Sequence, residues 1–185
     1  MTGYKFAPNY KVASTTPDYL ASMGATAEAV AEKYGISRED ADAFALRSHV
    51  RAANALDMGY FKDEIVPITV DHVVVKEGKK VSSTFVVDTD EGVRRSTSYE
   101  ALAKLKPAFK QGGMVTAGNS SQTSDGAAFV LVMSEALVKE LNLDPIARLI
   151  SCSVAGVDPL YMGIGPCAAI PKALKQAGIT LNDIN

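Results

Sequence analysis

The sequence predicts an α/β protein, and two repeated observations lead to that class. A continuous apolar segment at 127–133 has the composition of a strand covered on both faces, and a helix is expected directly after it, at 134–141. The same order returns with a strand-like segment at 146–155 and a helix that has Pro166 in its first turn. Strands that alternate with helices are typical of a sheet covered by helices.

The first third of the chain is expected to be mainly helical after an irregular lead-in at 1–19. Apolar residues at helical spacing predict one helix with Thr26 as its N-cap and Gly35 as its stop. A second helix is expected from Ser37, which precedes two acidic residues, to a stop at Gly59.

The middle of the chain changes character. Segments 64–75 and 81–87 are rich in Ile and Val, which predicts two irregular strands joined by a charged turn. A short helix is expected from Ser98 through Leu105, because Pro107 cannot continue it.

The last residues, 183–185, resemble the start of another strand. A strand-helix unit without a second parallel strand leaves an apolar face and a sheet edge uncovered. The sequence is therefore expected to be an interior piece of a longer chain.

Composition narrows the function classes. The 185 residues are 47% hydrophobic, which excludes fibrous and disordered proteins. A net charge of −2 lacks the positive excess that nucleic-acid binding usually needs. No apolar run approaches the roughly 20 residues of a membrane-spanning helix, and residues 1–11 lack the pattern of a secretory or transit signal. The sequence predicts a soluble protein with neither nucleic-acid nor membrane partners.

Cysteine and histidine are scarce, with two of each. These numbers predict no disulfide framework and no metal site, and they favour a reducing compartment, either the cytoplasm or an organellar matrix. Lys and Arg outnumber acidic residues over 76–110, whereas acidic residues dominate 18–64. The two stretches are either solvated faces or, for the basic one, the cover of a phosphate-bearing small ligand.

Three segments are dense in small and polar residues, at 22–28, 116–128 and 161–166. Glycine lets a backbone approach a ligand closely, and Ser or Asn at such a turn offers donors and acceptors. Each segment alone is typical of a capped turn, but together they point to a binding site.

The segment from Met114 to Ala128, MVTAGNSSQTSDGAA, resembles the signature of thiolases, the acyl-CoA acetyltransferases of fatty-acid and acetoacetyl-CoA metabolism. Supporting matches run along the whole chain in order: SMGATAE at 22–28, ISREDADAFALRSH at 36–49, FKDEIVP at 61–67, DEGVRRST at 90–97, LAKLKPAF at 102–109 and GVDPLYMGIGP at 156–166. The sequences SSQTSDGAA and DEGVRRST resemble broad-range 3-ketoacyl-CoA thiolases more closely than short-chain biosynthetic ones.

The resemblance implies an incomplete thiolase-like fold. Residues 1–122 would form the loop domain that binds CoA, and 123–145 the closing strand and helix of the N-terminal thiolase domain. Residues 146–185 would form the first strand-helix unit of the C-terminal domain. The nucleophilic cysteine of the family would lie before Met1, and its activating histidine, second cysteine and oxyanion-hole asparagine would lie after Asn185.

The resemblance also implies which residues contact CoA. Arg94 matches the arginine that lies against the adenine, where a guanidinium can stack and favour nearby phosphate; otherwise it is a solvated surface charge. Ser121 and Ala117 match residues beside the pantetheine arm. Met23 and Met162 match methionines that line the pantetheine end and the acyl pocket, or they are ordinary core residues.

Two further positions complete the implied contacts. Phe109 matches an aromatic residue along the pantetheine channel. His49 matches a ligand-facing position that is often glutamine, and it either touches CoA or is a helix-surface histidine. Two residues depart from the short-chain pattern: Ser22 replaces a histidine and Ala101 replaces a serine near the nucleotide.

No catalytic residue is expected in the chain itself. Cys152 is expected to pack within a strand, and Cys167, at a helix start, matches no catalytic position, although a helix N-terminus can lower the pKa of a thiol. With only His49 and His72 as bases, no Ser-His-acid set is evident.

The sequence is thus interpreted as an internal fragment of a 3-ketoacyl-CoA thiolase that supplies much of the CoA and pantetheine site and has no turnover alone. No cofactor is expected, since CoA is a substrate. The expected partners are CoA and acyl-CoA thioesters, with a homo-oligomeric parent, a dimer or tetramer. The alternative is a non-catalytic module for CoA binding or assembly.

Overall fold

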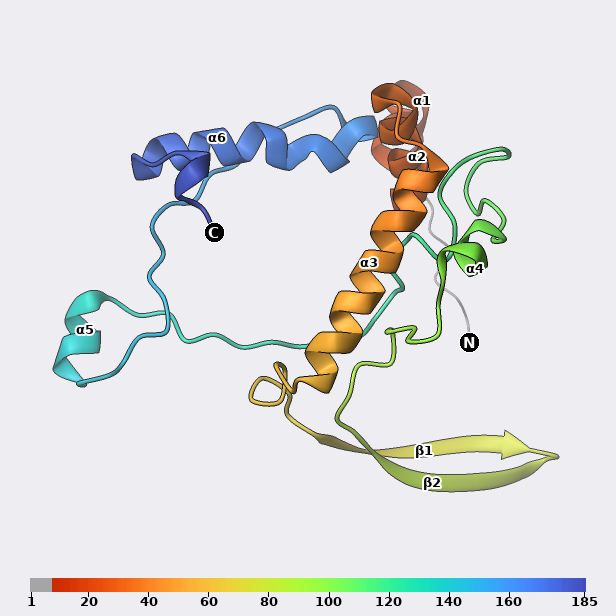
Figure 1. Cartoon of the computed structure of the whole chain (residues 1–185), viewed down its shortest axis with the longest axis horizontal. Coiled ribbons are helices and arrows are strands. Elements are labelled where there is room, and N and C mark those ends of the chain that lie inside the picture. The colour runs from red at the N-terminus through yellow and green to blue at the C-terminus, as the bar shows by residue number, and fades with distance from the viewer. Residues whose placement is uncertain (1–7) are drawn as a thin grey trace. The chain divides into compact units, whose positions relative to one another are not determined.

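The computed structural model describes residues 8–185, whose elements are drawn in Figure 1. The chain forms two structural units, each built from segments that are separated in the sequence. Of the described residues, unit 1 takes in 8–36, Pro107–Val115 and Thr123–Asn185, and unit 2 takes in Ser37–Lys106 and Thr116–Gln122. None of the described helices is both long enough and apolar enough to cross a membrane.

Unit 1 begins with two short helices where the irregular lead-in was expected. Helix α1 spans Tyr10–Thr15, and the 3-10 helix η1 spans Pro17–Leu20. The prediction for 1–19 is wrong over these helices, because the Asn9 side chain accepts from two N–H groups of α1 and a proline starts η1. Residues 1–7 of the expected lead-in lie outside the described residues.

Helix α2 (Met23–Tyr34) begins four residues before the position that a Thr26 cap would give. Its N-cap is Ser22, whose side chain accepts a first-turn N–H at 3.2 Å. Thr26, the expected cap, instead lies inside the helix and donates its hydroxyl to the Met23 carbonyl at 2.8 Å. The expected stop is confirmed, since Gly35 has a φ of 64° and caps the helix in the left-handed conformation.

The expected helix after Pro166 is confirmed as α6 (Gly165–Ala177), which Gly178 ends with a φ of 71°. It follows directly on the 3-10 helix η2 (Pro159–Ile164), which packs on α2. The Lys33 ammonium lies 3.8 Å from the centroid of the Tyr161 ring, a cation–π contact between α2 and η2.

The two expected sheet strands of unit 1 are extended segments instead. Neither 127–133 nor 146–155 is a strand, so these two predictions are wrong for the structure as described. Apolar side chains on 127–133 are almost fully exposed, with Phe129 at 96% and Val130 at 88%. An extended segment becomes a strand only when neighbours accept its backbone hydrogen bonds, and none of the described residues does so here. The helix expected after the first segment is confirmed as α5 (Glu135–Glu140), capped by Ser134.

Segment 151–155 keeps the side-chain alternation of a strand against α6. The Ser151 hydroxyl donates to the Ala173 carbonyl at 2.9 Å, and the Ser153 hydroxyl donates to the Ala169 carbonyl at 2.7 Å. Cys152, between them, is exposed rather than packed as expected. One helical turn and two extended residues cover similar lengths, so an antiparallel strand-helix contact satisfies both hydroxyls.

The chain end also differs from the prediction. Asp183, at which a strand was expected to begin, is instead the last residue of a 3-10 helix, η3 (Leu181–Asp183). The Asp183 carboxylate accepts from both the backbone N–H and the hydroxyl of Thr180, each at 2.8 Å. These hydrogen bonds lower the pKa of Asp183 and stabilise the turn. Ile184, which follows it, is extended.

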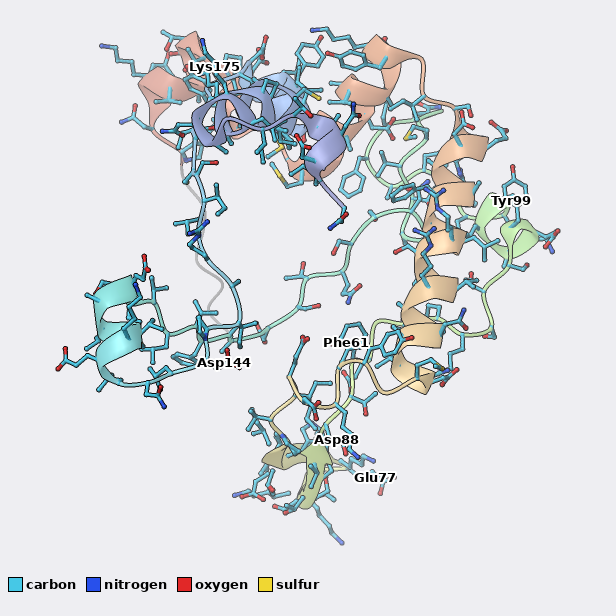
Figure 2. All side chains as sticks on the ribbon, turned by 60° about the vertical axis from the view of Figure 1, so that its left-hand side comes forward. Phe61, Glu77, Asp88, Tyr99, Asp144 and Lys175 are labelled. Carbon is cyan, nitrogen blue, oxygen red and sulfur yellow. The ribbon has the colours of Figure 1, made fainter. Side chains whose placement is uncertain are left out.

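Unit 2 is built on α3 (Arg38–Asp57), which begins at the predicted Ser37 cap. The predicted pair of strands is confirmed as an antiparallel hairpin of β1 (Ile68–Lys76) and β2 (Lys79–Val87), although residues 64–67 of the predicted first strand lie outside β1. Glu77 and Gly78 both have positive φ, as a two-residue hairpin turn requires. Figure 2 shows side chains on both faces of this hairpin between Asp88 and Glu77, and most of them are exposed.

The short helix of unit 2, α4 (Tyr99–Ala103), begins at the predicted Ser98 cap. It ends before the expected Leu105, whose N–H donates to the Leu102 carbonyl. Leu102 is 3% exposed and is the buried apolar residue of this unit.

Candidate functional site

The residues predicted to contact CoA divide between the two units. Those in unit 1 share a position on or beside α2, and they are Met23, Phe109 and Met162. Those in unit 2 lie on α3 or in loops, and they are His49, Arg94, Ala117 and Ser121.

Phe109 lies directly on the backbone of α2. A Cβ added at Gly24 would overlap the Phe109 ring, so the absence of a side chain at this position is what admits the ring. Met23, the preceding residue, is 62% exposed, and Phe109 is 50% exposed. The first turn of α2 therefore presents a sulfur side chain and an aromatic ring to solvent.

A buried carboxylate attaches the Phe109 segment to α2. Glu28 is 6% exposed and accepts the backbone N–H of Met114 at 3.0 Å and that of Val115 at 2.8 Å. The Val115 carbonyl accepts in turn from the N–H of Ala108 at 2.9 Å. These bonds close a loop around Phe109 and fix it against the helix.

An exposed ion pair adds a second attachment of the same loop. The Lys110 ammonium lies 2.6 Å from a carboxylate oxygen of Glu32. This hydrogen bond lowers the pKa of Glu32 below its ordinary value and raises that of Lys110. Both side chains are more than half exposed, so solvent screens the pair.

Met162 lies in η2, the element that packs on α2. Its neighbour Tyr161 makes the contact with Lys33 of α2, and a Cβ added at Gly163, on the other side, would meet Val30 of the same helix. Met162 itself is 44% exposed. Neither this methionine nor Met23 is a core residue of the structure.

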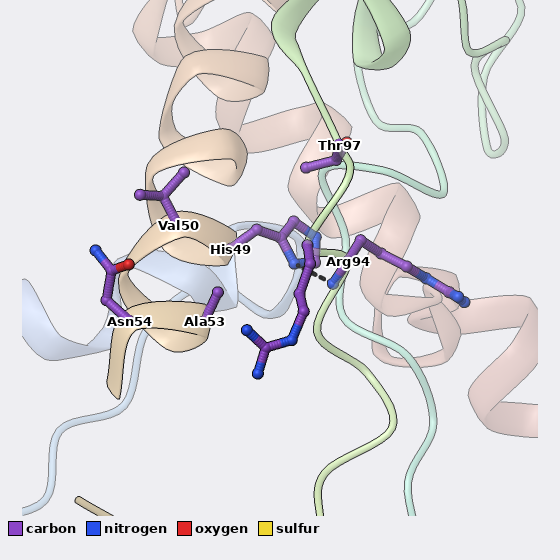
Figure 3. A pocket seen from close by; sticks show the side chains of 7 residues that line it. His49, Val50, Ala53, Asn54, Arg94 and Thr97 are labelled. Carbon is purple, nitrogen blue, oxygen red and sulfur yellow. Dashed lines mark hydrogen bonds between the residues drawn. The ribbon is translucent and has the colours of Figure 1, made fainter. Parts of the chain in front are cut away.

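One pocket of unit 2 lies between the second half of α3 and the segment after Gly92, as Figure 3 shows; a separate hollow lies along 85–91. The pocket beside α3 has a volume of about 150 Å³ and is lined by His49, Val50, Ala53, Asn54, Arg94, Arg95 and Thr97. The His49 ring is half-buried, and its Nδ1 accepts the backbone N–H of Arg94 at 3.2 Å. The ring proton therefore resides on Nε2, and the histidine holds the backbone beside it.

The two neighbouring arginines of this pocket differ in their pairing. Arg95 Nη1 lies 2.8 Å from the Asp57 carboxylate at the end of α3. Among residues 8–185, nothing forms an ion pair or hydrogen bond with the guanidinium of Arg94, which is exposed at the pocket. Arg94 is thus the cation of the pair that is free to meet an anion or an aromatic ring.

The turn at 116–121 places Ala117 and Ser121 at the surface. The Thr116 N–H donates to Asn119 Oδ1 at 2.8 Å, the Gly118 N–H donates to Thr116 Oγ1 at 3.1 Å, and the Ser120 hydroxyl donates to the Thr116 carbonyl at 2.6 Å. These three bonds leave Ala117 and Ser121 exposed while Thr116 is fully buried.

A second buried carboxylate supports this turn, and sequence reasoning did not find it. Asp42 is 1% exposed and lies 2.7 Å from Arg38 Nε and 3.0 Å from Asn119 Nδ2. Arg38 Nη2 also donates to two carbonyls, that of Leu102 in the last turn of α4 and that of Leu105 just after the helix. The available signal was the spacing of Arg38 and Asp42, which places the two side chains on one helix face. Glu28 was missed as well, although its spacing from the buried Ala31 carried a similar signal.

The two cysteines have no histidine in their unit. Cys152 and Cys167 are both exposed in unit 1, whereas His49 and His72 belong to unit 2. Cys167 lies in the first turn of α6, as expected. No group of three or more His, Cys, Asp or Glu among residues 8–185 is arranged to hold a metal ion.

Comparison with known proteins identifies the family of this chain. Residues 1–136 match the family model described as "Thiolase, N-terminal domain", and residues 143–185 match the one described as "Thiolase, C-terminal domain". The fold is therefore that of an incomplete thiolase-like α/β protein. The chain belongs to the thiolase family.

Relatives agree along the whole chain. It is 53% identical over 185 residues to a 3-ketoacyl-CoA thiolase of Bacillus subtilis, covering all of this chain and 47% of the relative. It is 54% identical over 168 residues to the peroxisomal 3-ketoacyl-CoA thiolase B of Rattus norvegicus, covering 91% of this chain and 39% of the relative. The chain thus spans less than half the length of these relatives.

Solved structures give the same likeness. The human mitochondrial 3-ketoacyl-CoA thiolase matches with a TM-score of 0.79 and 42% identity, over 98% of this chain and 45% of that one. The Bacillus anthracis acetyl-CoA acetyltransferase matches with a TM-score of 0.78 and 48% identity, over 87% and 39%.

Proposed function

We propose that this chain belongs to a 3-ketoacyl-CoA thiolase and contributes its CoA-binding surface rather than its reacting groups. The observation that carries the proposal is the free guanidinium of Arg94 at the unit 2 pocket, beside an arginine that is already paired. His49 accepts the backbone N–H of Arg94, which holds the Arg94 backbone beside the pocket. A cation held in this way suits the nucleotide end of CoA.

The remaining candidate residues suit the other parts of an acyl-CoA. Ala117 and Ser121 offer a small side chain and a hydroxyl at an exposed turn, where a pantetheine amide finds both space and a polar partner. Met23, Phe109 and Met162 offer exposed apolar and polarizable surface, which suits an acyl or thioester segment. The substrate class is therefore CoA and acyl-CoA thioesters.

The proposed reaction of the parent is acyl transfer between CoA thiols. A cysteine thiolate outside this chain attacks the ketone carbonyl of a 3-ketoacyl-CoA, the carbon–carbon bond breaks, and the leaving carbon takes up a proton to give acetyl-CoA. The CoA thiol then accepts the acyl group from the cysteine. Dividing the reaction into two covalent steps lowers the barrier of each. Cys152 and Cys167 lack a histidine within their unit, which supports the proposal that the chain has no turnover alone.

Isothermal titration of the chain with CoA tests this function. Arg94→Ala is expected to weaken CoA binding about tenfold, as the loss of a stacked guanidinium does. Arg95→Ala is the matched control and is expected to change the Kd less, because that arginine is engaged with Asp57. Equal effects of the two substitutions, or no CoA binding at all, would contradict the proposal.

An assay of acetoacetyl-CoA thiolysis tests the absence of turnover. The purified chain is expected to give the rate of a protein-free control. Thiolysis above that rate would overturn the assignment of the reacting groups to other parts of the parent.

The alternative function, assembly with further polypeptide, has an observation of its own. The exposed apolar segment 127–133 is long, extended and unpaired among the described residues, as a strand that joins a larger sheet would be. We propose a homo-oligomeric parent on the same ground. Sedimentation velocity distinguishes the roles: an assembly module self-associates without CoA, whereas an independent CoA-binding module remains monomeric and binds CoA.

A further inference from the structure

Asp42 is a buried carboxylate whose two oxygens are each used by a different donor. Arg38 Nε donates to Oδ2 at 2.7 Å, and Asn119 Nδ2 donates to Oδ1 at 3.0 Å. The Asp42 side chain is 1% exposed. A buried carboxylate is costly unless it is paired and hydrogen-bonded, so its presence requires these donors.

Asn119 connects this carboxylate to the backbone, because its amide group forms one hydrogen bond with Asp42 and another with Thr116. Its Nδ2 faces Asp42 and its Oδ1 accepts the N–H of Thr116 at 2.8 Å. The two atoms are opposite ends of one planar amide, so the carboxylate decides which end meets Thr116. If the amide were reversed, an NH₂ group would face the backbone N–H of a fully buried residue, which is a costly arrangement.

Arg38 fixes the other side of Asp42. Its Nη2 donates to the Leu102 carbonyl at 2.8 Å and to the Leu105 carbonyl at 3.0 Å, both in the segment where α4 ends. The guanidinium cannot reverse its polarity, because it has donors only. The order of donors and acceptors from Arg38 through Asp42 and Asn119 to Thr116 therefore has a single solution.

We propose that Asp42 is a positioning residue for CoA binding, acting through Asn119 to set the turn at 116–121 that presents Ala117 and Ser121. This inference rests on the proposed function, in which that turn faces the pantetheine arm. Asp42 itself is buried and touches no ligand. Its effect is to keep the surface of the turn in one conformation before CoA binds, which lowers the ordering cost of binding.

Exchanging the side chains at positions 42 and 119 tests this order of donors and acceptors. Asp42→Asn places an amide where only acceptors fit, so either Arg38 or Thr116 loses a bond. Asn119→Asp places two carboxylates against each other. In the double variant, the new amide at position 42 keeps an oxygen for Arg38 and donates to the new carboxylate at position 119, whose second oxygen accepts from Thr116. The double exchange thus restores all three bonds with one of them reversed.

Two readouts in the whole 185-residue chain separate this inference from the proposed function. Each single variant is expected to raise the Kd for CoA about tenfold and to speed amide hydrogen exchange at Thr116 and Gly118 by a similar factor. The double variant is expected to recover most of both losses, beyond the weaker single variant. Asp71→Asn is the matched control, an exposed carboxylate that accepts from the Thr84 hydroxyl in the hairpin, and it should change neither readout.

The possible results decide separately on the positioning role, its connection to CoA and the proposed function. Unchanged exchange at Thr116 in Asp42→Asn, or a double variant no better than the worse single one, overturns the positioning role. Faster exchange with an unchanged Kd overturns its connection to CoA. If the unmodified chain binds no CoA, the proposed function fails. The exchange data then still decide whether Asp42 positions the turn.

Discussion

Two buried carboxylates, Glu28 in unit 1 and Asp42 in unit 2, organise the candidate residues in different ways. Glu28 accepts directly from two backbone N–H groups, those of Met114 and Val115. Asp42 accepts only from side chains, and its effect reaches the backbone through Asn119. A loop can therefore be fixed either by one acceptor in direct contact with it or by a chain of side chains whose polarity must match at every step.

The difference has consequences for mutation. Direct contact needs only an acceptor of the right length, so a change at Glu28 affects one loop. The chain at Asp42 includes a fixed cation, so removing any member leaves a charge or a donor unpaired inside unit 2. The second arrangement is expected to be the more sensitive one.

Arg38→Met gives the largest expected effect. It removes the cation from Asp42 and the donor from two carbonyls, and loss of one partner of a buried pair costs about 3–5 kcal/mol. Urea unfolding followed by circular dichroism measures the free energy of unfolding. Arg38→Lys, which keeps a charge near Asp42, is expected to recover part of the loss. A loss for Arg38→Met smaller than that for Glu28→Gln would remove the contrast between the two carboxylates.

Glu28→Gln is expected to cost less. Glutamine keeps one acceptor but turns an NH₂ group toward a buried backbone N–H, which costs about 2–3 kcal/mol. Amide exchange at Met114 and Val115 should become faster, as measured by NMR. Glu32→Gln on the same helix is the matched control, since it disturbs only the exposed pair with Lys110 and is expected to leave those amides slow. Slow exchange at Met114 and Val115 in the Glu28 variant would show that Glu28 does not hold the loop.

Gly24→Ala tests the contact of Phe109 with α2. The new Cβ would overlap the ring, and overpacking of this kind costs about 1–3 kcal/mol. The ring protons of Phe109 should shift in the NMR spectrum as the ring moves away. Gly163→Ala provides the comparison, because its Cβ would meet Val30 at an ordinary 3.7 Å. If both alanines are tolerated equally, the ring does not lie on the helix backbone.

The ion pair of Lys110 and Glu32 gives the smallest expected effect. The pKa of Glu32 is lowered, so its contribution is present above its ordinary value of 4.5 and is lost as the pH falls through the lowered value. The pKa of Lys110 is raised, so its contribution is present below its ordinary 10.5 and is lost as the pH rises through the raised value. Lys110→Met should flatten the dependence of unfolding free energy on pH at both ends, and an unchanged profile would mean that the pair contributes nothing.

Local signals in the sequence predicted the elements that depend on local interactions. The Ser37 and Ser98 caps, the Gly35 stop and the hairpin turn each satisfy their backbone groups with residues nearby, and each is found where expected. Thr26 was misread because two hydroxyl residues precede the same apolar pattern, and Ser22 is the one that caps the helix. Which of the two hydroxyl residues caps the helix depends on the residue at which the helical conformation begins.

The failures share a physical cause. Segments 127–133 and 146–155 have strand composition, but strand formation depends on neighbours that supply hydrogen bonds from far along a chain. Glu28 and Asp42 look like ordinary polar positions on amphipathic helices, and their burial follows from loops that are distant in sequence. The candidate contacts with CoA came from the resemblance to thiolases, not from periodicity or composition, and they stay predictions.

A titration of the ¹⁵N-labelled chain with CoA, followed by backbone amide NMR shifts, tests the central claim that this chain carries a CoA-binding surface. Saturable shifts are expected at Arg94 and its neighbours around the unit 2 pocket, and at Ala117 and Ser121 on the 116–121 turn of the same unit. Shifts confined to the hairpin of β1 and β2, or no saturable shift at millimolar CoA, would contradict the claim.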